Sequence, residues 1–160
     1  MGAAPEEACR PAGAADLPRL SELAEAAVAE LSAGRGGLVW ARTRPRRAPY
    51  GPGFEAAVAD PSVHVVVGTL DGVAMAYGVV RVEVLDDGGR LGVIDDLFTE
   101  PGCREVGLGE AVMDSLLAWC REQGCFGVDS LALPGDRHTK NFFESFGLVA
   151  RAIIVHRSLP

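Results

Sequence analysis

Apolar residues recur at every third or fourth position in two long stretches of the chain, which is the spacing of an amphipathic helix. The first predicted helix begins after Asp16, a favourable N-cap residue, and ends near Gly34. Its apolar positions are Leu17, Leu20, Leu23, Ala24, Ala27, Val28 and Leu31. The second predicted helix ends near Gly124, a candidate C-cap. The residues on its inner face are Leu108, Ala111, Val112, Ser115, Leu116 and Trp119.

A third, shorter helix is predicted between Asp136, which can cap its N-terminus, and Gly147, which can end it. Its apolar residues are Phe142, Phe143 and Phe146. Between Gly36 and Gly53 three prolines interrupt any regular pattern. An irregular loop is therefore expected there, followed by a short helix over residues 53–60.

Three runs rich in β-branched residues lie between these helices: SVHVVVGTL, VAMAYGVVRVEVL and RLGVIDDLF. Turn sequences at Asp71-Gly72 and over residues 86–89 separate them, which predicts a three-stranded antiparallel meander. Further strands are predicted over residues 8–12, 126–133 and 149–159. Since a helix connects RLGVIDDLF to FGVDSLAL, these two strands are expected to pair in parallel. The fold class is therefore α/β, with helices packed on a mixed sheet.

The chain has 160 residues, enough for a single domain over residues 8–160 after a disordered segment over residues 1–7. It contains no apolar run of 18 residues, and its net charge of −7 disfavours nucleic acid and membranes as partners. The first residues lack the basic start and apolar block of a signal peptide, so a cytoplasmic location is expected. The four cysteines and three histidines follow no zinc-ligand spacing, so no metal site is predicted.

One segment departs from this acidic background: RTRPRRAPYGPG, residues 42–53, holds four arginines. Two interpretations remain open. The segment is either a solvated loop or a rim that attracts an anionic ligand or substrate.

The junction CREVGLGE, residues 103–110, leads into the second helix and carries the clearest candidate chemistry. The first N–H groups of a helix lack intrahelical partners and attract anions, and Gly107 and Gly109 let an anion approach the backbone. Arg104 can add a forked cation. The segment lacks the Lys-Ser/Thr pair of a Walker loop and the third glycine of a dinucleotide fingerprint. What remains is R-x-x-G-x-G, which predicts a pyrophosphate site; the alternative is a glycine turn that only permits tight packing.

The stretch CREVGLGEAVMDSLLAWCREQG resembles the acyl-CoA pyrophosphate loop of the GCN5-related N-acetyltransferase (GNAT) family, and the meander and TKNFFESFGL follow that family's order. The resemblance implies a GNAT fold, in which a bulged strand splays from its parallel neighbour to open a V-shaped cleft, and acetyl-CoA as cofactor. It places the pantetheine arm on Leu97, Phe98 and Thr99. The pyrophosphate would lie on Arg104, Glu105, Val106, Gly107, Leu108, Gly109 and Glu110.

The same resemblance implies acetyl transfer to an amine of a small molecule, a peptide or a protein. Asp95 and Asp96 are candidate general bases, and a regular strand would turn only one of them to the cleft; the alternative is that both are surface charges. Phe143 is assigned to the cofactor site. It stands where the family usually has a tyrosine that acts as a general acid and protonates the departing thiolate. This loss favours a second hypothesis, a non-catalytic acyl-CoA-binding sensor. A homodimer through the apolar edge ARAIIVHRSL is a further hypothesis.

Overall fold

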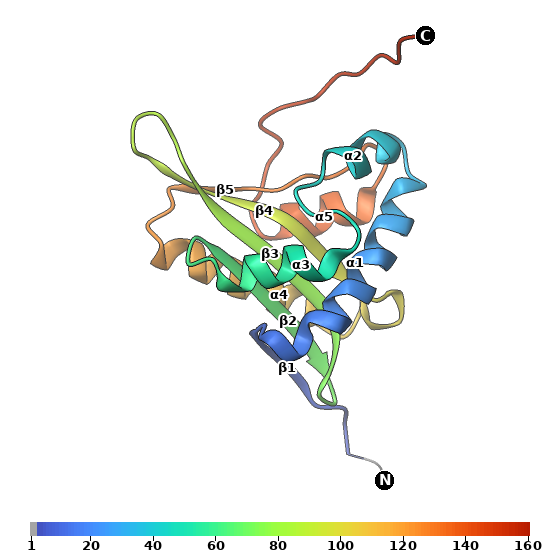
Figure 1. Cartoon of the computed structure of the whole chain (residues 1–160), viewed down its shortest axis with the longest axis vertical. Coiled ribbons are helices and arrows are strands. Elements are labelled where there is room, and N and C mark those ends of the chain that lie inside the picture. The colour runs from blue at the N-terminus through green and yellow to red at the C-terminus, as the bar shows by residue number, and fades with distance from the viewer. Residues whose placement is uncertain (1–2) are drawn as a thin grey trace.

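The computed structural model describes residues 3–160, and its centre is a five-stranded sheet in the order β1-β2-β3-β4-β5 (Figure 1). The strands are β1 (Glu7–Pro11), β2 (Val63–Leu70), β3 (Val73–Val84), β4 (Arg90–Thr99) and β5 (Gly127–Asp129). The helices are α1 (Leu17–Ser32), α2 (Gly37–Thr43), α3 (Tyr50–Ala59), α4 (Leu108–Glu122) and α5 (Arg137–Ser145). None of the helices in residues 3–160 is long and apolar enough to cross a bilayer.

The sheet is mixed, as predicted. The pairs β1–β2, β2–β3 and β3–β4 are antiparallel, which confirms the meander, and β4–β5 is parallel. The parallel pairing is short, because it joins only Leu91–Val93 to Gly127–Asp129. Beyond Val93, β4 continues to Thr99 without β5 beside it. The two strands therefore separate in the manner expected of a V-shaped cleft.

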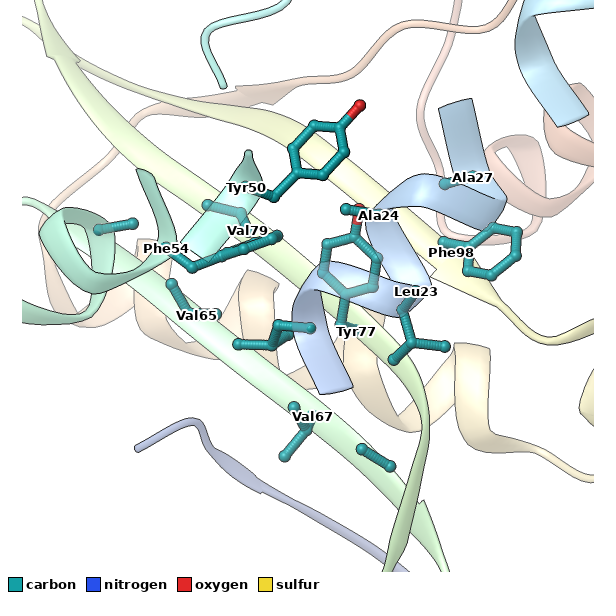
Figure 2. Packing of buried hydrophobic residues seen from close by; sticks show 13 residues of the cluster. Leu23, Ala24, Ala27, Tyr50, Phe54, Val65, Val67, Tyr77, Val79 and Phe98 are labelled. Carbon is teal, nitrogen blue, oxygen red and sulfur yellow. The ribbon is translucent and has the colours of Figure 1, made fainter. Parts of the chain in front are cut away.

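Helices cover both faces of this sheet. In Figure 1, α1 and α3 lie in front of the strands and α4 lies behind them. The front cluster packs α1 and α3 against β2, β3 and β4, and Figure 2 shows Phe54 and Tyr77 at its centre with Leu23 and Ala24 of α1 beside them. The rear cluster includes Val80 and Ile94 of the sheet together with residues of α4 and α5.

Small residues let α4 lie close to the strands. A Cβ on Gly78 of β3 would lie 2.7 Å from Cγ1 of Val112, and one on Gly92 of β4 would lie 2.6 Å from Sγ of Cys120. Both distances are shorter than real Cβ contacts, so these two strand glycines set the depth of the helix. This packing fixes the N-terminus of α4 relative to the end of β4.

The prediction of an irregular loop between Gly36 and Gly53 is wrong for most of this segment, because α2 and the first turn of α3 lie there. Pro49 occupies the N-cap of α3 and Pro52 lies in its first turn. A proline in the first helical turn costs no hydrogen bond, since its missing N–H would have no intrahelical acceptor. The prolines therefore mark the start of a helix here.

The chain ends also differ from the prediction. β1 already begins at Glu7, and Glu6 exchanges hydrogen bonds with Asp71, so residues 6 and 7 are ordered; residues 1 and 2 lie outside the described residues. The strand predicted over 126–133 covers only Gly127–Asp129. The last predicted strand does not form: residues 149–160 have no regular structure and extend away from the body of the protein (Figure 1).

Two aspartates, Asp16 and Asp136, were predicted to cap helices, and one of them does so. Asp136 caps α5 as expected, since its carboxylate accepts a hydrogen bond from the Thr139 N–H at 3.1 Å. Asp16 precedes α1 but does not cap it. Its carboxylate instead accepts hydrogen bonds from Arg10 and from the Gly13 N–H, and the resulting ion pair with Arg10 lowers the pKa of Asp16.

Candidate functional site

A β-bulge in β4 positions the two candidate bases. Val79 of β3 pairs with Asp96 and Val80 pairs with Ile94, so Asp95 is an extra residue in β4. Asp95 binds Arg81 and Asp96 pairs with Val79, and these two β3 residues lie on the same face because side chains alternate along a strand. A regular strand would send the two carboxylates to opposite faces, whereas the bulge turns both toward the α1 side; the expectation that only one of them faces the cleft stays a prediction.

Asp96 is sealed inside the protein. Its side chain is only 1% exposed, and its oxygens accept hydrogen bonds from Arg44 at 2.7 Å, from Arg46, and from the Tyr77 hydroxyl at 2.9 Å. We call Arg44, Arg46, Tyr77 and Asp96 the arginine cluster. Burial raises the pKa of Tyr77 well above its usual value, and the neighbouring Asp96 adds to this rise. Since the Asp96 carboxylate is buried behind these partners, no substrate amine can reach it in this arrangement.

Asp95 has a different environment. Its side chain is 10% exposed, and its contact with Arg81 is longer, at 3.1 Å. Burial raises the pKa of Asp95, although the positive charges of Arg81 and Arg46 oppose this rise. A carboxylate with a raised pKa holds a transferred proton more readily, so Asp95 has the chemical properties of a general base.

The N-terminus of α4 presents a row of free main-chain donors. Within residues 3–160, the N–H groups from Val106 to Glu110 make no hydrogen bond of good geometry to a protein acceptor, although residues 104–107 form a turn, and the first regular bond of the helix runs from Ala111 to the Gly107 carbonyl. We call residues 106–110 the amide corner. A helix N-terminus with unpaired N–H groups binds anions through these donors and through the helix dipole.

The two glycines of the amide corner have separate roles. Gly107 is the N-cap of α4 with a φ of 85°, a left-handed conformation that favours glycine. A Cβ on Gly109 would lie 3.2 Å from the Thr99 hydroxyl and 3.7 Å from the Phe142 ring. Gly109 therefore keeps the amide corner close to the end of β4. The Glu7 carboxylate also approaches, since its Oε2 lies 3.6 Å from where a Cβ of Gly107 would be.

Arg104, the predicted cation of this site, is held by other groups. Its guanidinium donates to the Thr99 carbonyl at 3.1 Å and forms an ion pair with Glu30 of α1 at 2.5 Å. It also lies over the Phe98 ring, 5.7 Å from the centroid. Arg104 therefore links α1 to the end of β4 and would have to leave Glu30 in order to bind a phosphate.

The remaining predicted cofactor residues lie at the end of β4 and around the amide corner. Leu97, Phe98 and Thr99 are the last residues of β4, beyond its pairing with β5. Glu105 is exposed beside the corner. Phe143 is buried in the rear cluster together with Leu108, the first residue of α4, and so brings an apolar ring rather than a proton donor to this region.

Sequence reasoning missed the arginine cluster. It noted the basic segment that contains Arg44 and Arg46 but left its role open, and it assigned no role to Tyr77. The partners are 50 and 52 positions apart in the chain, so no local spacing connects them. The only available signal was the unusual density of arginines in an acidic chain.

Comparison with known proteins places the chain among acetyltransferases. A family model described as the acetyltransferase (GNAT) family matches residues 25–148. No curated protein sequence matches the chain.

Three solved structures illustrate the shared fold. Glucosamine-6-phosphate N-acetyltransferase from Arabidopsis thaliana has a TM-score of 0.71 and 20% identity, with 97% of this chain and 99% of that chain covered. Aminoglycoside N-acetyltransferase AAC(6')-Iy, solved with CoA, has a TM-score of 0.76 and 14% identity, with 99% and 98% covered. An acetyltransferase from Trypanosoma brucei has a TM-score of 0.69 and 18% identity, with 96% and 100% covered.

Proposed function

The chain belongs to the acetyltransferase (GNAT) family, and on this premise we propose that it transfers an acetyl group from acetyl-CoA to a primary amine. The observation that carries the proposal is the amide corner, where five consecutive main-chain N–H groups have no well-aligned acceptor in the described chain. A pyrophosphate offers several oxygens to such a row of donors. We further propose that residues 8–160 form the one domain that performs this reaction.

The end of β4 supports the binding of the rest of the cofactor. Since β5 leaves β4 after Val93, the main chain from Leu97 to Thr99 has no second strand beside it. It is therefore open to an extended ligand such as a pantetheine arm, which would bind as an added strand does and would replace Arg104 at the Thr99 carbonyl. Gly109 and Thr99 lie against each other, so this strand end and the amide corner form one continuous surface.

Asp95 is the proposed general base. When bound, acetyl-CoA supplies the acetyl group as a thioester, and transfer of this group to the amine nitrogen releases the coenzyme as a free thiol. The acceptor must first lose a proton, because an alkyl ammonium has a pKa of about 10.4 in water. Asp95, with its raised pKa and its partly exposed side chain, accepts this proton directly or through a water molecule.

The Phe143 side chain cannot donate a proton, so the departing thiolate would take its proton from solvent. A thiol has a pKa of about 8.5, so the thiolate can depart without a general acid. A positioned general acid would raise the rate by about 10²–10⁴-fold. We therefore expect a slow but measurable enzyme. The structural relatives include enzymes named for acting on aminoglycosides and on glucosamine-6-phosphate. Their amines support a small-molecule amine as the acceptor here.

A homodimer is proposed from the C-terminal arm, residues 149–160. Its apolar side chains Val149, Ile153, Ile154, Val155 and Leu159 are 80–90% exposed. Arg151 forms an ion pair with Asp129, which holds the start of the arm beside the edge strand β5. An exposed apolar segment next to an unpaired sheet edge is a ready site for strand addition by a second copy. Light scattering should show a dimer for the wild-type protein and a monomer for Ile154→Glu; a wild-type monomer at micromolar concentration would contradict the proposal.

The experiment that tests the function is calorimetry with acetyl-CoA, followed by a free-thiol assay with a panel of amines. Wild-type protein should bind acetyl-CoA and release thiol in the presence of an acceptor. Gly109→Val should weaken binding at least tenfold while the fold survives, because its side chain would press on Thr99 and obstruct the amide corner. Binding without thiol release for any amine would favour the acyl-CoA-binding sensor, and unchanged affinity of the variant would contradict the proposed site.

A further inference from the structure

A basic pocket that is partly open to solvent lies between the end of α2 and the start of α3. Its volume is about 430 Å³, and it is lined by Ala41, Arg42, Arg46, Arg47, Ala48 and Tyr50. We call it the arginine cavity. A volume of this size is within the range of small-molecule sites, which is roughly 300–1,000 Å³.

The charges around the arginine cavity are not balanced. Of the four arginines in residues 42–47, two pair with Asp96, and the ion pairs found in residues 3–160 include no second carboxylate for any of the four. Arg42 and Arg47 are exposed, and among residues 3–160 the one acceptor of Arg47 is the Arg42 carbonyl, at 3.5 Å. The region therefore carries an excess of positive charge within a chain whose net charge is −7.

The buried arginines leave donors unused. The side chains of Arg44 and Arg46 are 5% and 8% exposed, and among residues 3–160 the Nε atom of each has no hydrogen-bond partner and is too deeply buried to contact a ligand in the cavity. A guanidinium has five N–H donors, and burying a donor without a partner is costly. Asp96 pairs with both buried guanidiniums, and the charge of Arg46 also acts on Asp95. Within residues 3–160, the two of these four arginines without a carboxylate partner are therefore Arg42 and Arg47, and an oxyanion in the cavity would pair with these two.

Packing holds Arg46 between the cavity and the strand. Its guanidinium lies over the Phe54 ring, 5.3 Å from the centroid, and a Cβ on Gly53 would lie 2.9 Å from its Cγ. One side of Arg46 lines the arginine cavity, and the other binds Asp96, the neighbour of the proposed base Asp95. Arg46 therefore lies between the cavity and the bulge of β4.

We propose that the arginine cavity binds an oxyanion of the acceptor, so that the acceptor is a small primary amine that also carries a phosphate or a carboxylate group. Guanidinium groups bind both oxyanions through paired hydrogen bonds. The inference deepens the proposed acetyl transfer and rests on it for the amine end of the acceptor. The binding of the oxyanion itself does not depend on catalysis.

The first test measures binding alone, by calorimetry with inorganic phosphate. Wild-type protein should bind phosphate, and the double variant Arg42→Gln/Arg47→Gln should weaken this binding at least tenfold, as expected for the loss of charge-assisted hydrogen bonds. Arg121→Gln, an exposed arginine on α4, is the matched control for the change in net charge and should bind as the wild type does. Phosphate binding that is absent, or that the double variant retains, overturns the inference.

Gly109→Val separates the two anion sites. If phosphate binding is lost in Gly109→Val and retained in the double variant, the phosphate lies at the amide corner and the inference is wrong, while the proposed function stands. If it is retained in Gly109→Val and lost in the double variant, the arginine cavity is the site. This readout holds even if no amine proves to be acetylated.

The second test compares matched acceptors by thiol release from acetyl-CoA: O-phosphoethanolamine, β-alanine and ethanolamine, which carry a phosphate, a carboxylate and neither. We expect kcat/KM for at least one of the two anionic amines to exceed that for ethanolamine about tenfold or more, and the double variant to bring this ratio toward one. The better of the two identifies the oxyanion. A wild-type ratio near one, or a ratio that survives in the double variant, overturns the inference.

Discussion

The amide corner and the arginine cluster both place hydrogen-bond donors near β4, but they are built in opposite ways. The corner uses main-chain N–H groups of consecutive residues, 106–110, at the start of one helix. The cluster uses side chains from three segments, with Arg44 and Arg46 reaching Asp96 over 52 and 50 positions of the chain. A site made of local backbone geometry depends on few side chains, whereas a site made of buried charges depends on every member.

The largest effect is expected at the arginine cluster. Asp96→Asn leaves two buried guanidiniums without their anion and should lower the free energy of unfolding by about 3–5 kcal/mol. Urea denaturation measures this change. Asp95→Asn is the matched control next to it and should cost no more than about 1 kcal/mol, because ionised Asp95 is already disfavoured by burial. Equal losses for the two variants would erase the contrast between the neighbours.

The next effect concerns catalysis by Asp95. The raised pKa of Asp95 means that the base is lost at a higher pH than an ordinary aspartate would be, so kcat/KM of the wild type should fall as the pH decreases through that raised value. Asp95→Asn should lack this acidic limb and be slower by about 10²-fold at neutral pH. A pH profile of thiol release checks both. Identical profiles for wild type and variant would remove Asp95 from the mechanism.

The smallest effect is expected at the amide corner, from Glu7. Its carboxylate lies close to Gly107 and would repel a bound pyrophosphate. Glu7→Gln should therefore tighten CoA binding by about two- to fivefold, with a larger gain at low salt because surface charges are screened. Calorimetry at two salt concentrations measures this. Weaker binding of the variant would mean that Glu7 supports the site.

The features that could be predicted are those that depend on residues adjacent in the sequence. The meander followed from β-branched runs and turn sequences, the α5 cap from Asp136, and the helix start from Gly107 and Gly109. The bulge in β4 was expected from the family resemblance, but its effect on Asp95 and Asp96 was not, because the direction of each side chain depends on pairing with β3.

The unpredicted parts depend on contacts distant in sequence. Nothing near Arg44 indicates that Asp96 lies beside it, and Arg104 resembles a free phosphate ligand until Glu30 of α1 is placed against it. The C-terminal arm has the apolar pattern of a strand, yet a strand needs a partner, and the chain alone provides none for residues 149–160. Local pattern therefore predicts the elements, and tertiary packing determines which charges meet.

The central claim is that the free N–H groups of residues 106–110 bind the pyrophosphate of coenzyme A. The most direct measurement follows the backbone amide resonances of the ¹⁵N-labelled protein during titration with coenzyme A and, in parallel, with pantetheine, which lacks the pyrophosphate. The account predicts that Val106–Glu110 shift strongly with coenzyme A and little with pantetheine, while Leu97–Thr99 respond to both. Unshifted resonances of Val106–Glu110 at saturating coenzyme A would contradict it.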